Sequence, residues 1–355
     1  MKKKYAAVMA ALTMLLTMSG CSVSPSSNTP ELPKLATEHS YVNYNNQSRA
    51  EMHIEEDTLY LTYEEEEYDG DPDYANHLFS VSQNGLRQMG GGLPFQFIKN
   101  GTDIYYIEFT DDTRYLKKMD TETDERVCVL EEVDAFLVYH DMIVASVKDQ
   151  LLTVSETGEC RCLSEGRFPF ITANETAVFA VEENGTVWQF VPDTWESRKI
   201  GAVSYQDHPF SIAVSGHYLA ARFLESKVVA VLDMDAGDCQ TYHVPFQIED
   251  MTAGRNDTVY FVGCENVDST RLLYQMDPGS GQIKEMAELT GTVIELYIYD
   301  DEWIYVADHG YDWRFGVNEI ERVATDGSKR EPVYSTSLAD YHVLQRQKRT
   351  KHANG

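Results

Sequence analysis

The side chains in this 355-residue sequence that could do chemistry gather in two segments that combine carboxylates with aromatic rings. The first segment contributes Tyr68, Asp69, Asp71, Asp73 and Tyr74, and the second contributes His309, Tyr311, Asp312, Trp313, Arg314 and Phe315. Three rings of the second segment stand two residues apart, so in a hairpin they would share one face. That face could stack on a sugar or anchor a partner protein, with inward packing as the alternative. We therefore predict ligand binding at these two segments.

The alternating carboxylates of Asp69, Asp71 and Asp73 raise the question of a metal site, because hard cations such as calcium prefer oxygen ligands. The segment departs from the EF-hand pattern at two positions. Tyr74 stands at the sixth position, where glycine is required, and Ser80 stands at the twelfth, where glutamate is required. A weak calcium site and a solvated acidic loop both stay open, and we expect no other cofactor.

The sequence contains none of the common catalytic motifs. It has no Gly-x-Ser-x-Gly nucleophile elbow, no His-Glu-x-x-His zinc motif, no P-loop and no Rossmann glycine pattern. Its ten histidines are scattered along the chain. We therefore predict no catalytic residue, and the sequence favours a binding protein over an enzyme.

The candidate residues lie in a chain that repeats about every 41 residues. Alternating strands rich in Tyr, Val and Ile begin at residues 58, 103, 142, 176, 217, 258 and 302. Each is followed by a second alternating strand with a polar turn and preceded by a further short strand, which in four units opens with Pro-Phe. Four short strands per unit without a helix predict an all-β fold, a β-propeller of seven four-stranded blades over residues 48–336. We expect the repeated Phe to belong to the core between blades.

The propeller model places the candidate residues together. In a blade of strands A, B, C and D, the B–C loops and the D–A linkers emerge on the same face. Three B–C loops are long, at residues 64–74, 264–270 and 308–316, and ring closure makes the sixth, seventh and first units neighbours. We therefore expect acids and aromatic rings to collect on one sector of one face, since binding residues usually lie on long loops. Acidic loops that bind nothing are the alternative.

The N-terminus has the features of an export signal. Three lysines precede an uncharged stretch, residues 5–18, that is too short for a comfortable membrane span. It ends in Ser19-Gly20-Cys21, and two small residues before a cysteine resemble the lipobox of bacterial lipoproteins. The resemblance implies a signal peptide at residues 1–20, a lipid on Cys21 and a location on the extracytoplasmic face of the cell membrane. Residues 21–47 read as a Ser/Pro-rich tether, and residues 337–355 as a basic C-terminal tail.

Charge and cysteine content narrow the possible partners. The 58 acidic and 29 basic side chains give a formal net charge of −29, which argues against nucleic acid as a partner because like charges repel. Five cysteines remain after Cys21, an odd number that rules out complete disulfide pairing. Cys160 and Cys162 lack the spacing of a zinc or redox site. We expect these five residues to be buried thiols.

Two of the repeated units extend the resemblance to a family. Residues 104–120 and 317–328 look like blades of uncharacterised bacterial surface lipoproteins whose propeller is similar to that of the low-density-lipoprotein receptor. This sequence has Tyr105-Tyr106-Ile107-Glu108 where the receptor carries Tyr-Trp-Thr-Asp. The resemblance implies the fold and a surface location, and it brings no catalytic residues.

These observations lead to one functional expectation with two alternatives. We expect a monomeric, membrane-anchored lipoprotein that acts as a non-catalytic scaffold for a protein or carbohydrate partner. One alternative is a propeller hydrolase or lyase acting on surface polysaccharide, with Asp, His and Arg side chains converging at the axis. The other is an assembly factor for envelope proteins.

Overall fold

The computed structural model describes most of the region in which the repeats were found. The described residues are 43–48, 52–55, 58–64, 76–82, 85–93, 97–110, 113–203, 209–223, 227–266, 269–291, 294–309, 317 and 319–335. Cys21, the predicted signal segment at residues 1–20 and the predicted tail at residues 337–355 lie outside the described residues. Within the described residues, no helix is long and apolar enough to cross a membrane.

Within these described residues, twenty-eight strands follow one short 3-10 helix, η1 (Tyr44–Ser48). Blades 1 and 2 contain β1 (Met52–Glu55), β2 (Thr58–Glu64), β3 (Asn76–Ser82), β4 (Gly85–Leu93), β5 (Phe97–Asn100), β6 (Asp103–Thr110), β7 (Thr113–Asp120) and β8 (Arg126–Glu131). Blades 3 and 4 contain β9 (Val133–Tyr139), β10 (Met142–Val147), β11 (Gln150–Val154), β12 (Cys160–Glu165), β13 (Phe170–Ala173), β14 (Val178–Val181), β15 (Thr186–Val191) and β16 (Glu196–Ala202).

The remaining three blades have the same composition. They contain β17 (Pro209–Ser215), β18 (Tyr218–Phe223), β19 (Val228–Asp233), β20 (Cys239–His243), β21 (Gln247–Ala253), β22 (Val259–Cys264), β23 (Arg271–Met276), β24 (Ile283–Leu289), β25 (Ile294–Ile298), β26 (Trp303–Asp308), β27 (Glu319–Ala324) and β28 (Arg330–Ser335). Each blade is a four-stranded antiparallel sheet whose strands pair in chain order. The seven-bladed β-propeller predicted from the sequence is therefore confirmed, and the predicted strands correspond to the second strand of each blade.

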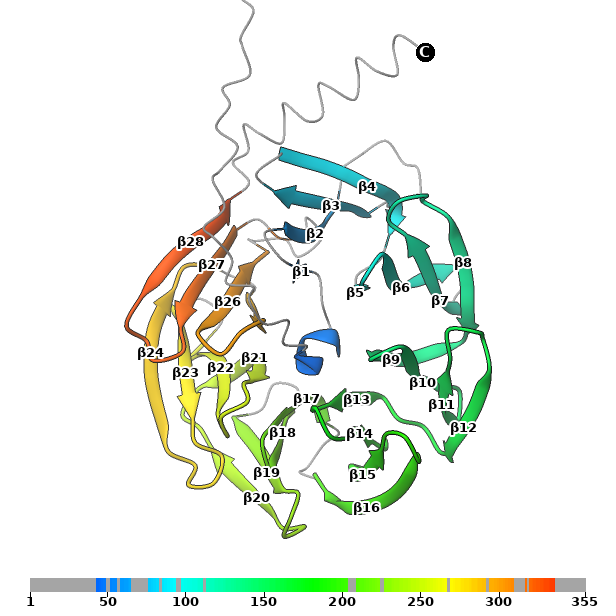
Figure 1. The fold of residues 1–355 in the computed structure, drawn as a ribbon. Coiled ribbons are helices and arrows are strands. Elements are labelled where there is room, and N and C mark those ends of the chain that lie inside the picture. The colour runs from blue at the N-terminus through cyan, green and yellow to red at the C-terminus, as the bar shows by residue number, and fades with distance from the viewer. Residues whose placement is uncertain are drawn as a thin grey trace, which may run out of the picture. The chain divides into compact units, whose positions relative to one another are not determined.

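The blades surround a common axis, with the first strand of each blade innermost and η1 in the middle of the ring (Figure 1). The first and last strands of the fold, β1 and β28, belong to different sheets, so no sheet combines the two ends of the ring. Side-chain packing closes it instead: Met52 and Leu61 of blade 1 share one buried cluster with Tyr305 and Ile320 of blade 7. Blades 7 and 1 are therefore neighbours.

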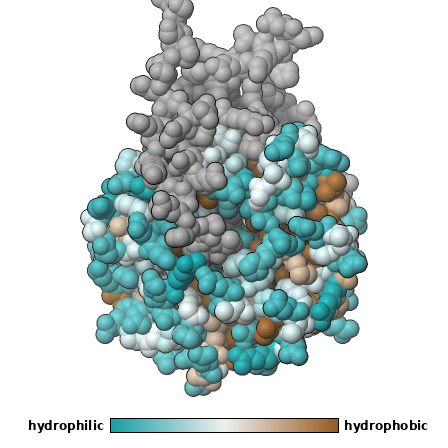
Figure 2. All heavy atoms as spheres, viewed as in Figure 1, coloured by the Kyte–Doolittle hydropathy of each residue, from teal (hydrophilic) through white to brown (hydrophobic). Residues whose placement is uncertain are grey.

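The core lies between adjacent blades. Phe246, one of the repeated Phe residues, is buried in a cluster that joins blades 5 and 6, and its ring stacks on Tyr274 with centroids 4.1 Å apart. A Cβ on Gly263 would come within 2.3 Å of the Phe246 ring, so this close packing requires glycine. The predicted role of Phe246 between blades is confirmed. Hydrophilic residues cover most of the described surface in Figure 2, with apolar residues scattered among them.

The cysteines differ from our expectation of buried thiols. Only Cys264 is buried, whereas Cys128, Cys160, Cys162 and Cys239 are exposed, and no disulfide joins any two of these five described residues. The exposed four lie on β8, β12 and β20, which are the outermost strands of their blades. No further strand covers these positions, so the prediction of burial was wrong for them.

Candidate functional site

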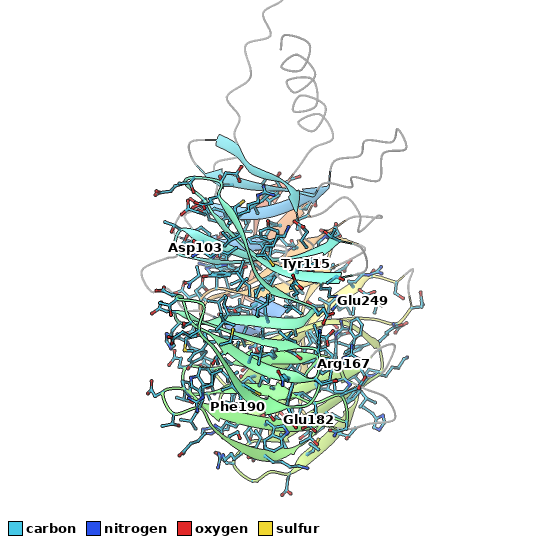
Figure 3. The ribbon with its side chains drawn as sticks, turned by 90° about the vertical axis from the view of Figure 1, so that its right-hand side faces the viewer. Asp103, Tyr115, Arg167, Glu182, Phe190 and Glu249 are labelled. Atoms are coloured by element: carbon cyan, nitrogen blue, oxygen red, sulfur yellow. The ribbon has the colours of Figure 1, made fainter. Side chains whose placement is uncertain are left out.

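The two faces of the ring are distinguished by the connections that they carry. The A–B and C–D turns lie on one side, here called the A–B face, and the B–C loops and D–A linkers lie on the other, the B–C face. An edge-on view shows Arg167, Glu182 and Glu249 toward one side and Asp103 toward the other (Figure 3). The B–C loops of blades 1, 6 and 7 are long, whereas those of blades 2 and 3 contain two residues each.

Most residues that the sequence singled out lie outside the described part of the chain. These are Tyr68, Asp69, Asp71, Asp73, Tyr74, Tyr311, Asp312, Trp313, Arg314 and Phe315, and they stay predictions. His309 is described: its side chain is buried, and its Nε2 lies 3.5 Å from Oε2 of Glu295 on the inner strand of blade 7. Among the described residues, no three His, Cys, Asp or Glu side chains gather as a metal site would require.

A buried ion pair lies beside the long B–C loop of blade 6. Arg271 donates from Nε and Nη2 to the two carboxylate oxygens of Glu249, at 3.1 and 3.0 Å. The Cys264 thiol donates to the same carboxylate at 3.2 Å. Burial, reinforced by this hydrogen bond, raises the pKa of Cys264 to about 11, so its sulfur stays protonated at neutral pH. The group therefore holds the loop base in place and offers no thiolate nucleophile.

A second polar group connects blades 5, 6 and 7 near the same face. Arg222 is buried, and it donates from Nε to Oγ of Ser211 at 2.9 Å and from Nη1 to the Ile248 carbonyl at 3.3 Å. Asp250, 4.0 Å from the Arg222 guanidinium, accepts a 2.8 Å hydrogen bond from the backbone N–H of Leu296. No periodic pattern in the sequence predicts these contacts, although an arginine inside an apolar strand indicates a buried partner.

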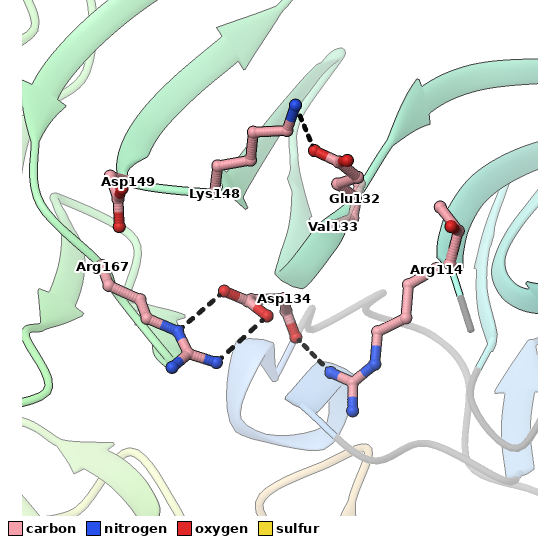
Figure 4. A pocket seen from close by; sticks show the side chains of 8 residues that line it. Arg114, Glu132, Val133, Asp134, Lys148, Asp149 and Arg167 are labelled. Carbon is pink, nitrogen blue, oxygen red and sulfur yellow. Dashed lines mark hydrogen bonds and ion pairs between the residues drawn. The ribbon is translucent and has the colours of Figure 1, made fainter.

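A charged pocket of about 680 Å³ opens on the B–C face between blades 2, 3 and 4 (Figure 4). Arg167 pairs with both carboxylate oxygens of Asp134, at 3.0 and 3.5 Å, and with Glu183 at 3.4 Å. The hydrogen bonds to Asp134 raise the pKa of Arg167 further. The residues that line the pocket are Thr113, Arg114, Glu132, Val133, Asp134, Lys148, Asp149 and Arg167.

The pocket is also marked by its backbone. Glu132 and Lys148 adopt left-handed backbone conformations, with φ of 59° and 54°. Their side chains form an ion pair, and the backbone N–H of Lys148 donates to the Glu132 carbonyl at 3.3 Å. Such φ values are uncommon outside glycine and turn-forming residues. The other non-glycine residues in this conformation, among those described, all lie in turns of the A–B face. Sequence reasoning missed this pocket, because its residues come from three blades.

At the A–B end of the axis, η1 uses amide side chains to bind the inner strands. Gln47 donates to the Val138 carbonyl at 3.1 Å and accepts from the Val138 N–H at 2.8 Å. Asn45 makes the same pair of bonds with Val214, at 2.8 and 2.7 Å. Both backbone partners lie one residue before the end of their inner strands, so η1 sits at the A–B end.

Further contacts extend this binding to blades 4 and 6. The side-chain oxygen of Asn45, Oδ1, also accepts a hydrogen bond from Oγ1 of Thr172. Its side-chain nitrogen, Nδ2, donates to the Ala253 carbonyl at 3.2 Å. Tyr44 stacks on Tyr139 with centroids 5.0 Å apart. We expected residues 21–47 to form a tether, and the described end of that range instead packs against blades 3 to 6. The run of amide residues from Asn43 to Gln47 was the signal for this contact.

Known proteins resemble this chain in fold. No protein-family model matches the sequence, and no curated protein matches it either. The β-propeller protein Hsv2 of Kluyvelomyces marxianus matches over 80% of this chain and 96% of its own, with a TM-score of 0.51 at 9% identity. Apo AztD of Citrobacter koseri matches over 78% of this chain and 85% of its own, with a TM-score of 0.50 at 10% identity. The computationally designed Ika8 protein matches over 85% of this chain and 99% of its own, with a TM-score of 0.50 at 14% identity. At these identities the likeness shows the propeller fold alone.

Proposed function

We propose that this protein is a lipid-anchored extracytoplasmic propeller that binds a protein or carbohydrate partner on its B–C face without catalysis. In this proposal Cys21 carries the lipid that holds the chain to the outer side of the cell membrane. The ring itself acts as a monomeric scaffold. The long loops of blades 1 and 7, with Trp313 and the acidic residues 69–73, contact the partner.

The proposal rests on one difference between the two faces of the ring: which polar groups and loops each face carries. The B–C face has the charged pocket, the long loops and the buried pairs at their bases. The A–B end of the axis is filled by η1, whose amides are used in bonds to backbone atoms. The titratable groups described at the base of the blade 6 loop support binding over catalysis, because the Cys264 thiol is held neutral and Arg271 is committed to Glu249.

The loops are tested by capture of the partner on intact cells. Chemical crosslinking of the full-length lipidated chain is compared between the native protein, a deletion of residues 68–74, Trp313→Ala, and Asn256→Ala, a control on the exposed A–B face. We expect both loop variants to lose the crosslinked product while their thermal unfolding stays unchanged. Capture that persists in both loop variants would remove these loops from the proposal.

The anchor is tested separately. Cys21→Ser is expected to abolish incorporation of labelled palmitate and to move the protein from the membrane fraction to the soluble fraction. A variant that stays labelled and membrane-bound would contradict lipidation at Cys21.

A further inference from the structure

We propose that the pocket between blades 2, 3 and 4 binds a peptide segment in which acidic and basic side chains alternate. The inference rests on the proposed function, because it names a ligand class for the same B–C face. It concerns blades 2, 3 and 4, whereas the predicted loops belong to blades 1, 6 and 7. Its support comes from the charge balance, the exposure and the backbone geometry of the pocket.

The pocket lining carries both positive and negative side chains, so it fits a ligand that carries both signs of charge. Among the described residues, the lining carries three cations, Arg114, Lys148 and Arg167, and three carboxylates, Glu132, Asp134 and Asp149. An anion bound to the cations would leave the carboxylates beside it uncompensated, and a bound cation would do the same to the arginines. A segment that presents both charges can replace both partners of an existing pair, so its binding leaves no charge unmatched.

The existing pairs are exposed enough to exchange. The Lys148 and Glu132 side chains are 68% and 45% exposed, and the Arg167 side chain is 49% exposed. Exposed ion pairs contribute little to stability, so opening one for a ligand costs little. Lys148 has three N–H donors and a single carboxylate partner, Glu132, among the described residues. Asp149 is exposed and lines the same pocket, so its carboxylate can meet a ligand cation.

The pocket is also rigid and lacks the features of a sugar site. Its two left-handed residues, Glu132 and Lys148, fix the positions from which opposite charges face each other, and uncommon backbone conformations concentrate at binding sites. Asp134 is held between Arg167, on its carboxylate, and Arg114, on its carbonyl oxygen at 3.3 Å. No aromatic ring is among the described residues that line the pocket, so these residues offer a sugar no stacking surface. These features favour a charged peptide over a carbohydrate.

The experiment measures fluorescence anisotropy of a labelled hexapeptide of alternating Glu and Lys against the purified full-length protein. Hexaglutamate and hexalysine with the same label serve as comparison probes. The test variant is Lys148→Gln/Arg167→Gln. Its matched control is Arg198→Gln/Lys199→Gln, which removes the same charge from exposed positions on the outermost strand of blade 4.

We expect the alternating peptide to bind more tightly than either homopolymer, and its affinity to fall at least tenfold in the test variant and not in the control. Equal loss in both variants would show a general field effect and overturn the proposal. Hexaglutamate that binds as tightly as the alternating peptide would show a plain anion site and would overturn it too. Partner capture that persists in both loop variants, with peptide binding intact, would instead count against the proposed function.

Discussion

At the A–B end of the axis, Asn45 and Gln47 direct their amide groups at backbone atoms of the inner strands, whereas on the B–C face Lys148 and Arg167 face carboxylates near solvent. The backbone partners belong to buried strands and cannot be exchanged without opening the ring. The Glu132 carboxylate is exposed and the Asp134 carboxylate is partly exposed, so groups of a ligand can replace them. The comparison shows that polar side chains stabilise the fold at one end and remain available for binding at the other.

The largest effect is expected at the A–B end. Asn45→Ala removes bonds to Val214, Ala253 and Thr172 and leaves buried backbone groups without partners, each of which costs about 1 to 3 kcal/mol. We expect the free energy of unfolding, measured by urea titration, to fall by about 3 kcal/mol. Asn256→Ala, at an exposed turn, is the control, and an equal loss there would break the comparison.

A smaller effect is expected at the buried pair of blade 6, which lies toward the B–C face but is shielded from solvent. Arg271→Met leaves the Glu249 carboxylate without its guanidinium partner. Because Glu249 is 21% exposed, the free energy of unfolding should fall by about 2 kcal/mol, less than the roughly 3 to 5 kcal/mol of a fully buried pair. Adding Glu249→Leu should restore most of that loss, because it removes the uncompensated charge. A double variant as unstable as the single one would show that the pair acts through packing and not charge.

The pH dependence of stability is expected to come partly from His53 on the inner strand of blade 1. Burial, followed by the nearby Lys99 charge, lowers the pKa of His53 to about 3, so the folded protein keeps it neutral. The unfolded chain takes up this proton near pH 6.5, so stability is complete above that pH and falls as pH drops from 6.5 toward 3.

Between pH 6.5 and 5 the contribution of His53 should reach about 1 to 2 kcal/mol, which is measurable by urea titration at several pH values. His53→Asn should flatten this part of the pH profile. Parallel profiles for the native chain and the variant would show that His53 is accessible to protons in the folded state.

The smallest effect on stability is expected at the pocket. Lys148→Gln/Arg167→Gln removes exposed ion pairs only, so the free energy of unfolding should change by less than about 1 kcal/mol. Thermal unfolding of the variant and of Arg198→Gln/Lys199→Gln should therefore coincide. A large loss of stability in the pocket variant alone would show that Lys148 and Arg167 stabilise the fold, as the η1 contacts at the A–B end do.

The sequence predicted the blades well because their signal is local. Alternation with a period of two residues places predicted strand starts such as Thr58, Asp103 and Met142 at the first residues of β2, β6 and β10. The contacts of η1 have no such signal, since Asn45 and Val214 are 169 residues apart. The pocket likewise joins three blades, and the exposure of Cys160 depends on which strand of the blade is outermost. These features depend on tertiary arrangement and could not be read from spacing.

Amide hydrogen exchange of the full-length protein, with and without the alternating Glu–Lys hexapeptide, tests the division between the two faces most directly. Without peptide, the Val138 and Val214 amides that donate to η1 should exchange slowly. Adding the peptide should slow exchange at residues 132–134 and 148–149 and leave residues 43–48 and the A–B turns unchanged. Protection that appears at η1 or at the A–B turns instead would contradict the assignment of binding to the B–C face.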